Sequence, residues 1–411
     1  MALPVFLSLL TPAEAWRRLE EHIEPGPREV ETSDLLGACG RVLAEDVKSP
    51  CDLPGFLRST VDGFGVRAAD TFGASDSMPA FLTVAGEVRM GEAAGFTLGP
   101  GECARLATGA MLPGGADAVV MVETAEDMGS GLIAVAKPVV PGENVVSPAE
   151  DVARGDVLLR RGRRLRPQDV GMLAAAGVSS VRVAAGPRIA IVSTGDELVD
   201  ITAAPLPGKV RDTNSYSLHA AALAAGARPV AAGVVRDDYR EVILAMREQL
   251  AQADMLVVSG GSSIGTRDFA RDAVDSLGPP GVLVHGVAVR PGKPTILAVA
   301  GGKPVFGLPG HPVSCLTIFR VFVEPAIARW MGTTPERREV EARLGANVAS
   351  VAGREDYVGV RVSMRDGVRW ADPVFTKSAL ISGLVASDGF VRVPAEAEGL
   401  EKGTLVMVTL F

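Results

Sequence analysis

The sequence predicts a multidomain α/β protein, in which a central parallel α/β domain is flanked by regions rich in β structure. Its 411 residues suffice for about two to four domains with sizeable cores. Strand-like and helical segments alternate from about residue 188 to 331, the pattern of a parallel sheet covered by helices. On either side, short apolar segments separated by glycine and proline favour β domains.

The chain opens with a predicted helix followed by a glycine-rich link. Thr11 suits the N-cap, Pro12 suits the first helical position, and Glu14 completes a capping box. We expect this helix to run to about Ile23 and to stop before Pro25-Gly26-Pro27. The segment 53–66 is predicted to be a link into a new domain.

The region from 81 to about 146 is predicted to form a compact β-rich domain. The expected strands are Phe81–Ala85, Cys103–Leu106, Ala118–Val122 and Ile133–Ala136. A basic segment, 160–166, then precedes a predicted helix from Pro167 to Ala176, which Gly177 ends.

The central domain is predicted to alternate strands with helices. The expected strands are Ile189–Val192, Val230–Val235, Met255–Val258, Val282–Val289 and Pro304–Leu308. The expected helices are Tyr216–Ala225, Tyr239–Gln252, Phe269–Leu277 and Val313–Trp330. After about Gly332 the segments Val340–Leu344, Tyr357–Met364, Phe390–Pro394 and Leu405–Thr409 predict a small β-barrel or sandwich.

Composition excludes several classes of protein. The formal net charge of −8 argues against a general nucleic-acid binder, which normally has a basic face. The four cysteines and four histidines lack the spacing of a zinc site or a disulfide framework. No basic residue precedes the apolar N-terminal segment and no stretch is long and apolar enough to span a bilayer, so we expect a cytoplasmic protein without membrane partners.

The stretch from Asp254 to Asp268 is the most informative in the chain. An apolar strand breaks into a loop of glycine and serine, whose backbone can approach a ligand closely and whose N–H groups suit an anion. Asp268 follows at the end of the loop, where a carboxylate can hold a metal ion against that anion. The alternative is an ordinary strand-to-helix turn with incidental serines.

The other strands of the central domain also end in polar or glycine-rich segments. Ligands of open α/β sheets bind outside the carboxyl ends of the strands. The segments at the remaining four ends are Ser193-Thr-Gly-Asp-Glu197, Arg236-Asp237-Asp238, Arg290-Pro-Gly-Lys-Pro294 and Gly307-Leu-Pro-Gly-His-Pro-Val-Ser314, and Asp212-Thr-Asn214 lies in a connection. Each alone is explained by turns and caps. Jointly they predict a pocket for a polyanionic ligand with a divalent cation, for which Mg²⁺ is well suited.

These segments resemble the molybdopterin molybdenumtransferase family, MoeA and the E domain of gephyrin, over nearly the whole chain. Further matching motifs are Pro54-Gly-Phe, Ser59-Thr-Val-Asp-Gly-Phe64, Ala107-Thr-Gly-Ala110, Gly115-Ala-Asp-Ala-Val-Val120, Glu150-Asp151 and Ser259-Gly-Gly-Ser-Ser263. The resemblance implies four domains. They are an extended linker domain used in dimerisation (1–58 plus 147–186), a β-rich domain (59–146), a central MogA/MoaB-like α/β domain (187–331) and a C-terminal β-barrel-like domain (332–411).

The resemblance also implies an activity and its partners. The family inserts molybdate into the dithiolene of adenylylated molybdopterin, with release of AMP, in a Mg²⁺-dependent reaction. A homodimer is implied, in which each site combines parts of both subunits. An adenylyltransferase would supply the substrate, and apoproteins of molybdoenzymes or their chaperones would receive the cofactor.

Site residues follow from the matching motifs. The functional polar set comprises Asp62, Thr108, Asp151, Glu197, Asp237 and Asp268, of which Glu197, Asp237 and Asp268 are the expected Mg²⁺ ligands. The expected ligand contacts are Ser193, Thr194, Gly195, Ser259, Gly260, Gly261, Ser263, Arg290, Lys293, Pro309, Pro312, Arg354 and Ser378. Arginine and lysine provide positive charge for molybdate, and the fork of arginine suits a tetrahedral oxyanion.

The chain departs from the common family pattern at four positions, Leu57, Ala149, Arg290 and His311. None is an expected cation ligand, but they leave tungstate open as a substrate in place of molybdate. Two other functions also stay open: an adenylyltransferase that acts on molybdopterin with ATP, and a non-catalytic carrier of the finished cofactor.

Overall fold

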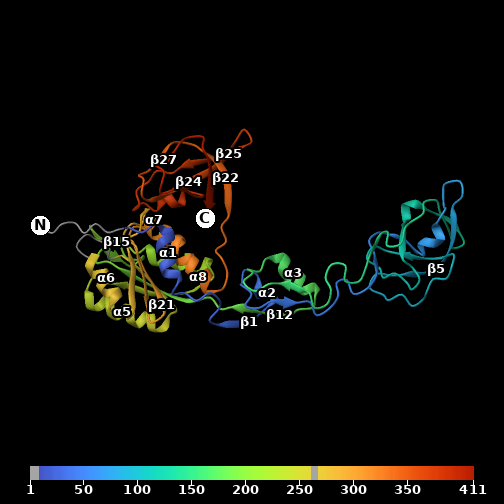
Figure 1. Ribbon diagram of the computed structural model, residues 1–411, viewed down its shortest axis with the longest axis horizontal. Helices are drawn as coiled ribbons and strands as arrows, with labels where there is room; N and C mark the ends of the chain where they lie inside the picture. The colour runs from blue at the N-terminus through green and yellow to red at the C-terminus, as the bar shows by residue number, and fades with distance from the viewer. Residues whose placement is uncertain (1–8, 261–266) are drawn as a thin grey trace.

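The protein is elongated, with a bulky part at each end of a narrow arm (Figure 1). This computed structural model describes residues 9–260 and 267–411, with the backbone alone described at 231–232 and 267–270. The α/β unit and the C-terminal β unit lie together at one end, and the unit that contains β5 (Ala80–Val88) lies at the other. In the described part of the chain, no helix combines the length and apolar character needed to cross a bilayer.

The central unit is built on a mixed sheet, which has six strands in the described part of the chain. Its strands, in spatial order, are β16 (Arg228–Val235), β13 (Arg188–Thr194), β17 (Met255–Ser259), β21 (Lys303–Leu308), β20 (Ile296–Ala300) and β18 (Pro280–His285). The first four are mutually parallel, while β20 is antiparallel to both β21 and β18. The expectation of an all-parallel sheet is therefore wrong at β20, which sequence reasoning missed. Because two antiparallel steps restore direction, β18 still points the same way as the four parallel strands.

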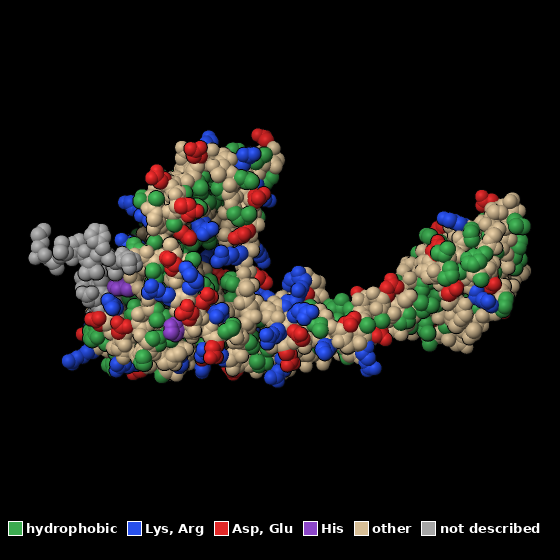
Figure 2. Space-filling model, viewed as in Figure 1, with side chains coloured by type: hydrophobic (Ala, Val, Ile, Leu, Met, Phe, Trp, Pro, Cys, Tyr) green, Lys and Arg blue, Asp and Glu red, His purple; other side chains and the backbone are tan. Residues whose placement is uncertain are grey.

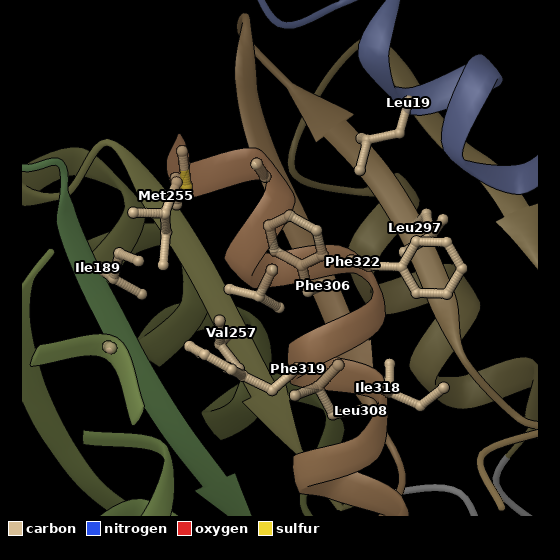
Figure 3. Close-up of a cluster of buried hydrophobic side chains, with 14 of the residues drawn as sticks. Leu19, Ile189, Met255, Val257, Leu297, Phe306, Leu308, Ile318, Phe319 and Phe322 are labelled. Carbon is tan, nitrogen blue, oxygen red and sulfur yellow. The ribbon is translucent and has the colours of Figure 1, made fainter. Parts of the chain in front are cut away.

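Apolar side chains alternate between the two faces of this sheet, so that both faces are buried. Ile189, Ile191 and Phe306 belong to a core cluster on one face, with side chains from α1 (Pro12–Glu20), α4 (Asn214–Ala224) and α7 (Pro312–Ile318). Figure 3 shows part of this cluster, with Phe306, Phe319 and Phe322 beside the strands. Ala190, Val192 and Leu256 face the other way, toward α5 (Tyr239–Gln252) and α6 (Arg267–Asp275).

Two helices of this unit differ in detail from their predicted forms. The capping box of α1 is present, with Glu14 N–H donating to Thr11 Oγ1 at 3.2 Å, but the helix ends at Glu20 instead of about Ile23. The predicted helix 313–330 is divided into α7, a π-helical turn η3 (Phe319–Val323) and α8 (Glu324–Trp330). Pro325 lacks the N–H that would bond one turn back, and this accounts for the widened turn.

The far unit is β-rich, as predicted. Its sheet has the order β7 (Ala118–Met121), β4 (Gly63–Val66), β6 (Glu102–Leu106), β5, β9 (Leu132–Val135) and β8 (Ala125–Gly129). The interpretation of 53–66 as a link is wrong at its end, because β4 is a buried inner strand. A Cβ on Gly63 would lie 2.0 Å from the Val120 carbonyl oxygen, so glycine here serves the close approach of two strands.

The C-terminal unit is a closed five-stranded barrel in the described chain, which confirms the predicted barrel and excludes an open sandwich. Strands β24 (Glu355–Arg365), β25 (Val368–Pro373), β22 (Glu339–Leu344), β28 (Leu405–Leu410) and β26 (Gly389–Val393) pair in that order, and β26 returns to β24. Sequence reasoning missed β25, although Asp366-Gly367, both left-handed, form the turn expected of a tight hairpin. A short sixth strand, β19 (Val289–Arg290), adds to β24 from the central unit.

The arm is held by paired strands and one buried carboxylate. In it β1 (Val30–Asp34) pairs with β12 (Ser180–Ala184), and β2 (Val47–Lys48) pairs with β11 (Val157–Leu159). The helix α3 (Pro167–Ala175) ends beside the left-handed Gly177, as predicted. In its first turn Asp169, 4% exposed, accepts two bonds from Arg163 (Nε 3.0 Å, Nη2 2.8 Å) and one from Arg166 Nε (3.1 Å).

Replacement of Asp169 by asparagine should lower the free energy of unfolding at pH 7 by about 2–3 kcal/mol, because it breaks a buried ion pair whose arginines are only partly covered. Burial favours a raised pKa at Asp169, but the bonds from Arg163 and Arg166 outweigh it and hold the pKa well below its ordinary value. The stabilisation should therefore be complete above the ordinary pKa of about 3.9 and disappear as the pH falls through the folded value. Urea unfolding at several pH values measures this, with the exposed pair Arg105–Asp127 as control: Asp127→Asn should cost about 0.5 kcal/mol at most.

Ala149 occupies a left-handed backbone conformation, with φ of 60°, at a position where the family commonly has glycine. Because this conformation costs a non-glycine residue roughly 1–2 kcal/mol, and glycine adds about 0.4–1 kcal/mol of unfolded-state entropy, Ala149→Gly should stabilise the protein by about 0.5 kcal/mol. The urea midpoint measures the change. Ala153→Gly is the matched control in the same segment, and a midpoint that falls equally in both variants would contradict the prediction.

Candidate active site

The carboxyl ends of the parallel strands open into one cavity of about 1900 Å³ between the central unit and the barrel. This exceeds the roughly 300–1,000 Å³ of most small-molecule sites, so the cavity can accommodate a ligand larger than a single nucleotide or pterin. Many of the predicted contacts line it: Thr194, Glu197, Asp237, Ser259, Gly260, Arg290, Lys293, Pro309, Pro312, Arg354 and Ser378.

One wall of this cavity is acidic. Glu197 and Asp237 follow β13 and β16, and the Asp237 N–H donates to Asp196 Oδ1 at 3.3 Å. Burial raises the pKa of Asp237, and the charges of Glu197 and Asp196 raise it further. Asp268, the third predicted cation ligand, lies in the first turn of α6, but its side chain is outside the described residues. Among the described residues, no group of three or more His, Cys, Asp or Glu side chains is placed to hold a metal.

The floor of the cavity is a buried network of hydroxyl and amide groups. Ser193 Oγ donates to Asp212 Oδ1 at 3.2 Å and shares a hydrogen bond of 2.8 Å with Ser215 Oγ. Asn214 Nδ2 donates to the Gly310 carbonyl at 2.8 Å and so ties α4 to the loop before α7. Ser193, predicted as a ligand contact, is instead completely buried beneath the cavity, where it supports these groups. Gly195 follows β13 and is not among the lining residues.

Cationic side chains form a second, basic wall of the cavity. Arg290 and Lys293 lie in the segment after β18, and Arg354 is the residue directly before β24. Asp356 lies between the two arginines, with Arg354 Nε donating to its Oδ1 at 2.9 Å and Arg290 Nη1 3.6 Å from its Oδ2. The cavity therefore has acidic residues that follow β13 and β16 and basic residues that follow β18 or precede β24. This combination suits a ligand that carries both bound cations and exposed anionic oxygens.

Ser378 joins the barrel to the start of α7. Its Oγ is 2.9 Å from His311 Nδ1, and its carbonyl accepts a bond from the Val313 N–H at 3.1 Å. Pro309 and Pro312 lie on either side of His311 in the lining. The predicted contacts of the loop 307–314 and of Ser378 therefore meet at one end of the cavity.

Three predicted residues lie far from this cavity within the chain. Asp62 Oδ1 accepts bonds from the Thr108 N–H (2.7 Å) and hydroxyl (2.9 Å) in the β-rich unit, and these bonds lower its pKa. Asp151 lies in the exposed turn that enters the arm. The arm separates the far unit, which contains Asp62 and Thr108, from the two units whose residues line the cavity (Figures 1 and 2). Gly261 and Ser263 of the glycine loop lie outside the described residues.

A second cavity of about 1530 Å³ lies between α1, α8 and the barrel. It contains none of the predicted site residues. Volume alone therefore does not identify which cavity binds the ligand. The acids, the serines and the glycine loop at the strand ends favour the first cavity as the binding site.

Three family models match successive parts of the chain. They are the MoeA N-terminal region (domain I and II) at residues 10–177, the probable molybdopterin binding domain at 190–329, and the MoeA C-terminal region (domain IV) at 341–411. The chain belongs to the MoeA family.

Relatives of this MoeA-family chain match along almost their whole length. A putative molybdopterin biosynthesis protein of Methanocaldococcus jannaschii is 36% identical over 96% of this chain and 95% of its own. The molybdopterin molybdenumtransferase of Bacillus subtilis is 35% identical over 97% of this chain and 93% of its own. A crystal structure of the molybdopterin biosynthesis MoeA protein of Pyrococcus horikoshii matches with a TM-score of 0.87 and 32% identity, over 98% of this chain and all of that chain. The predicted family and multidomain α/β fold are confirmed.

Sequence reasoning missed Asp356, Asn214 and His311 as site residues. Asn214 and His311 lie within segments that predict the pocket, 212–214 and 307–314, but neither was among the predicted ligand contacts. Asp356 had a detectable signal, because residues two apart in a strand share a face and Arg354 precedes it by two.

Asp237→Asn should stabilise the metal-free protein at pH 7 by about 0.5 kcal/mol, a small value because the side chain is exposed to solvent screening. A raised pKa means that the folded state loses stability as the pH rises through the folded value, and bears no such cost below the ordinary pKa of about 3.9. The gain should therefore shrink from pH 7 toward pH 4. Thermal unfolding in EDTA measures it. Asp76→Asn, exposed in the far unit, should show no such trend, and a loss of stability at pH 7 in Asp237→Asn would refute the explanation.

Proposed function

We propose that this protein is a molybdopterin molybdenumtransferase of molybdenum cofactor biosynthesis. It inserts molybdate into the dithiolene of adenylylated molybdopterin and releases AMP. The observation that carries the proposal is the cavity lined by both acidic and basic residues, at the strand ends of the unit that matches a molybdopterin-binding domain. The full-length match to a named molybdopterin molybdenumtransferase supports the same activity.

The two walls have different tasks in this proposal. Arg290, Lys293 and Arg354 bind the tetrahedral molybdate through charge-assisted hydrogen bonds. The glycine loop, Thr194 and Ser259 bind the phosphate oxygens of the adenylylated substrate. The substrate is thereby held with its dithiolene beside the oxyanion, and proximity supplies much of the rate enhancement.

Mg²⁺ is the proposed cation of the acidic wall. The donors fit it, because the carboxylates of Glu197 and Asp237 line the same cavity. Burial, and to a lesser extent the charges of Glu197 and Asp196, raise the pKa of Asp237, and a bound cation would offset both effects. Glu197, Asp237 and Asp268 would hold it together with substrate oxygens, since Mg²⁺ is usually bound by one or two carboxylates plus phosphates. When bound, it would neutralise charge on the phosphate that leaves with AMP.

A homodimer is part of the proposal. Asp62, Thr108 and Asp151 belong to the functional polar set by family motif, yet the arm of their own chain holds them away from the cavity. A second subunit can supply them. We also propose a cytoplasmic location, an adenylyltransferase that supplies the substrate, and molybdoenzyme apoproteins or their chaperones as acceptors. The net charge of −8 supports the absence of a nucleic-acid partner, and no membrane partner is proposed.

The decisive assay supplies adenylylated molybdopterin, molybdate and Mg²⁺ to the purified protein and measures AMP release and cofactor formation. Glu197→Ala and Asp268→Ala should each lower kcat/KM by about 100-fold or more, because they remove groups that act on the reacting phosphate. Glu248→Gln, exposed on α5, is the control and should retain full activity.

Each alternative has its own outcome in this assay. A cofactor carrier would show altered affinity in the two variants without any turnover to lose. An adenylyltransferase would adenylylate molybdopterin with ATP in the absence of molybdate. Substitution of tungstate for molybdate in the same assay decides the preferred oxyanion. Absence of AMP release from the wild-type protein would overturn the proposed function.

A further inference from the structure

Asp356 is a buried carboxylate on the basic wall of the cavity. It is 3% exposed, and it is the second residue of β24. Burial of a carboxylate is costly unless cations and hydrogen bonds compensate. The compensation here comes from two arginines that are themselves more exposed, since their side chains are 62% (Arg290) and 32% (Arg354) accessible.

The two arginines come from different units of the fold. Arg354 belongs to the barrel and bonds Asp356 through Nε at 2.9 Å and Nη2 at 3.5 Å. Arg290 belongs to the segment that leaves the central unit, and its Nη1 is 3.6 Å from Asp356 Oδ2. One carboxylate therefore allows two guanidinium groups, which would otherwise repel one another, to occupy the same wall.

The contact with Asp356 leaves further N–H donors available on both arginines. A guanidinium has five N–H donors, and Asp356 takes two from Arg354 and makes an ion pair with one nitrogen of Arg290. Both side chains line the cavity beside Lys293. The remaining donors can bind a tetrahedral oxyanion with two negative charges.

The Asp356 carboxylate is not needed to join the central unit to the barrel. The backbone already joins the two units, because Val289 and Arg290 pair with Glu355 and Asp356, and Glu355 N–H donates to the Ala288 carbonyl at 2.9 Å. The carboxylate adds contacts to the arginine heads beyond that backbone pairing. Its position therefore favours a role in their orientation.

We propose that Asp356 is a positioning residue for the oxyanion substrate, and that it holds Arg290 and Arg354 so that both bind one molybdate or tungstate ion. The proposal rests on the proposed function and names a residue that acts through its neighbours. Removal of the negative charge makes the wall more positive. If Asp356 only offset charge, its loss would strengthen oxyanion binding, whereas a positioning role predicts weaker binding.

The test uses Asp356→Asn in the full-length protein. Asparagine keeps the shape and one acceptor for Arg354, but it loses the charge that holds Arg290. The KM for molybdate should rise about tenfold or more, while kcat at saturating molybdate and the KM for adenylylated molybdopterin should change by less than about threefold. Calorimetric titration with molybdate, and separately with tungstate, should show the same loss of affinity without the second substrate.

Two further variants separate positioning from stability. Asp372→Asn is the control, because Asp372 bonds Arg365 and Ser363 in the same barrel and is not among the residues that line the cavity. It should leave the KM for molybdate unchanged. In an Arg290→Met background, Asp356→Asn should have a much smaller effect than in the wild type, since neighbours that act together are not additive.

Each outcome of these measurements supports or overturns the positioning role of Asp356. Unchanged or tighter oxyanion binding in Asp356→Asn overturns the inference, and so does a loss of thermal stability with no change in either KM. If Asp356→Asn does not fold, Asp356→Glu keeps the charge but displaces it by one methylene, and it should raise the KM for molybdate about threefold. Wild-type protein that binds molybdate but releases no AMP would refute the proposed function, and the calorimetric comparison would still test Asp356.

Discussion

The backbone pairing of Val289 and Arg290 with Glu355 and Asp356 determines the shape of the site. The strand β19 leaves the central unit and pairs in parallel with the first residues of β24 in the barrel. This pairing brings the central unit and the barrel together around one cavity. Everything placed on the basic wall depends on it, because Arg290 arrives with β19 while Arg354 and Asp356 arrive with β24. The acidic wall, in contrast, depends only on the direction of the central strands.

The direction of those strands could be predicted, and so could several of the residues that line the cavity at their ends. Apolar runs that alternate with helices require parallel strands, and parallel strands place their carboxyl ends at one edge. This is why Glu197, Ser259 and Lys293, far apart in sequence, line one cavity. The error at β20 does not change which strand ends share an edge. Because β20 is antiparallel to both β21 and β18, β18 has the same direction as the four parallel strands. A hairpin of β20 and β21 was also detectable, since the left-handed Gly301-Gly302 joins them.

Other features could not be predicted from one sequence. The contact between Arg290 and Asp356 depends on how two units dock, and no local pattern encodes that docking. The burial of Ser193 beneath the cavity depends on Asp212 and Ser215, which arrive from another connection. The inner strand β4 was not predicted because its glycines, of which Gly63 permits the close approach to β7, give the segment the composition of a link. Local rules fail here because tertiary packing overrides them.

The proposed homodimer, which the length of the arm supports, has a genetic consequence. A site that takes Asp62 from one chain and Glu197 from another is divided between two copies of the gene product. Two defective copies, one altered in the far unit and one at the strand ends, would then assemble a mixed pair with one intact site. Such a pair of alleles would complement one another, while either allele alone would not support the pathway. In that homodimer the subunit pair, and not the single chain, would be the unit on which selection acts.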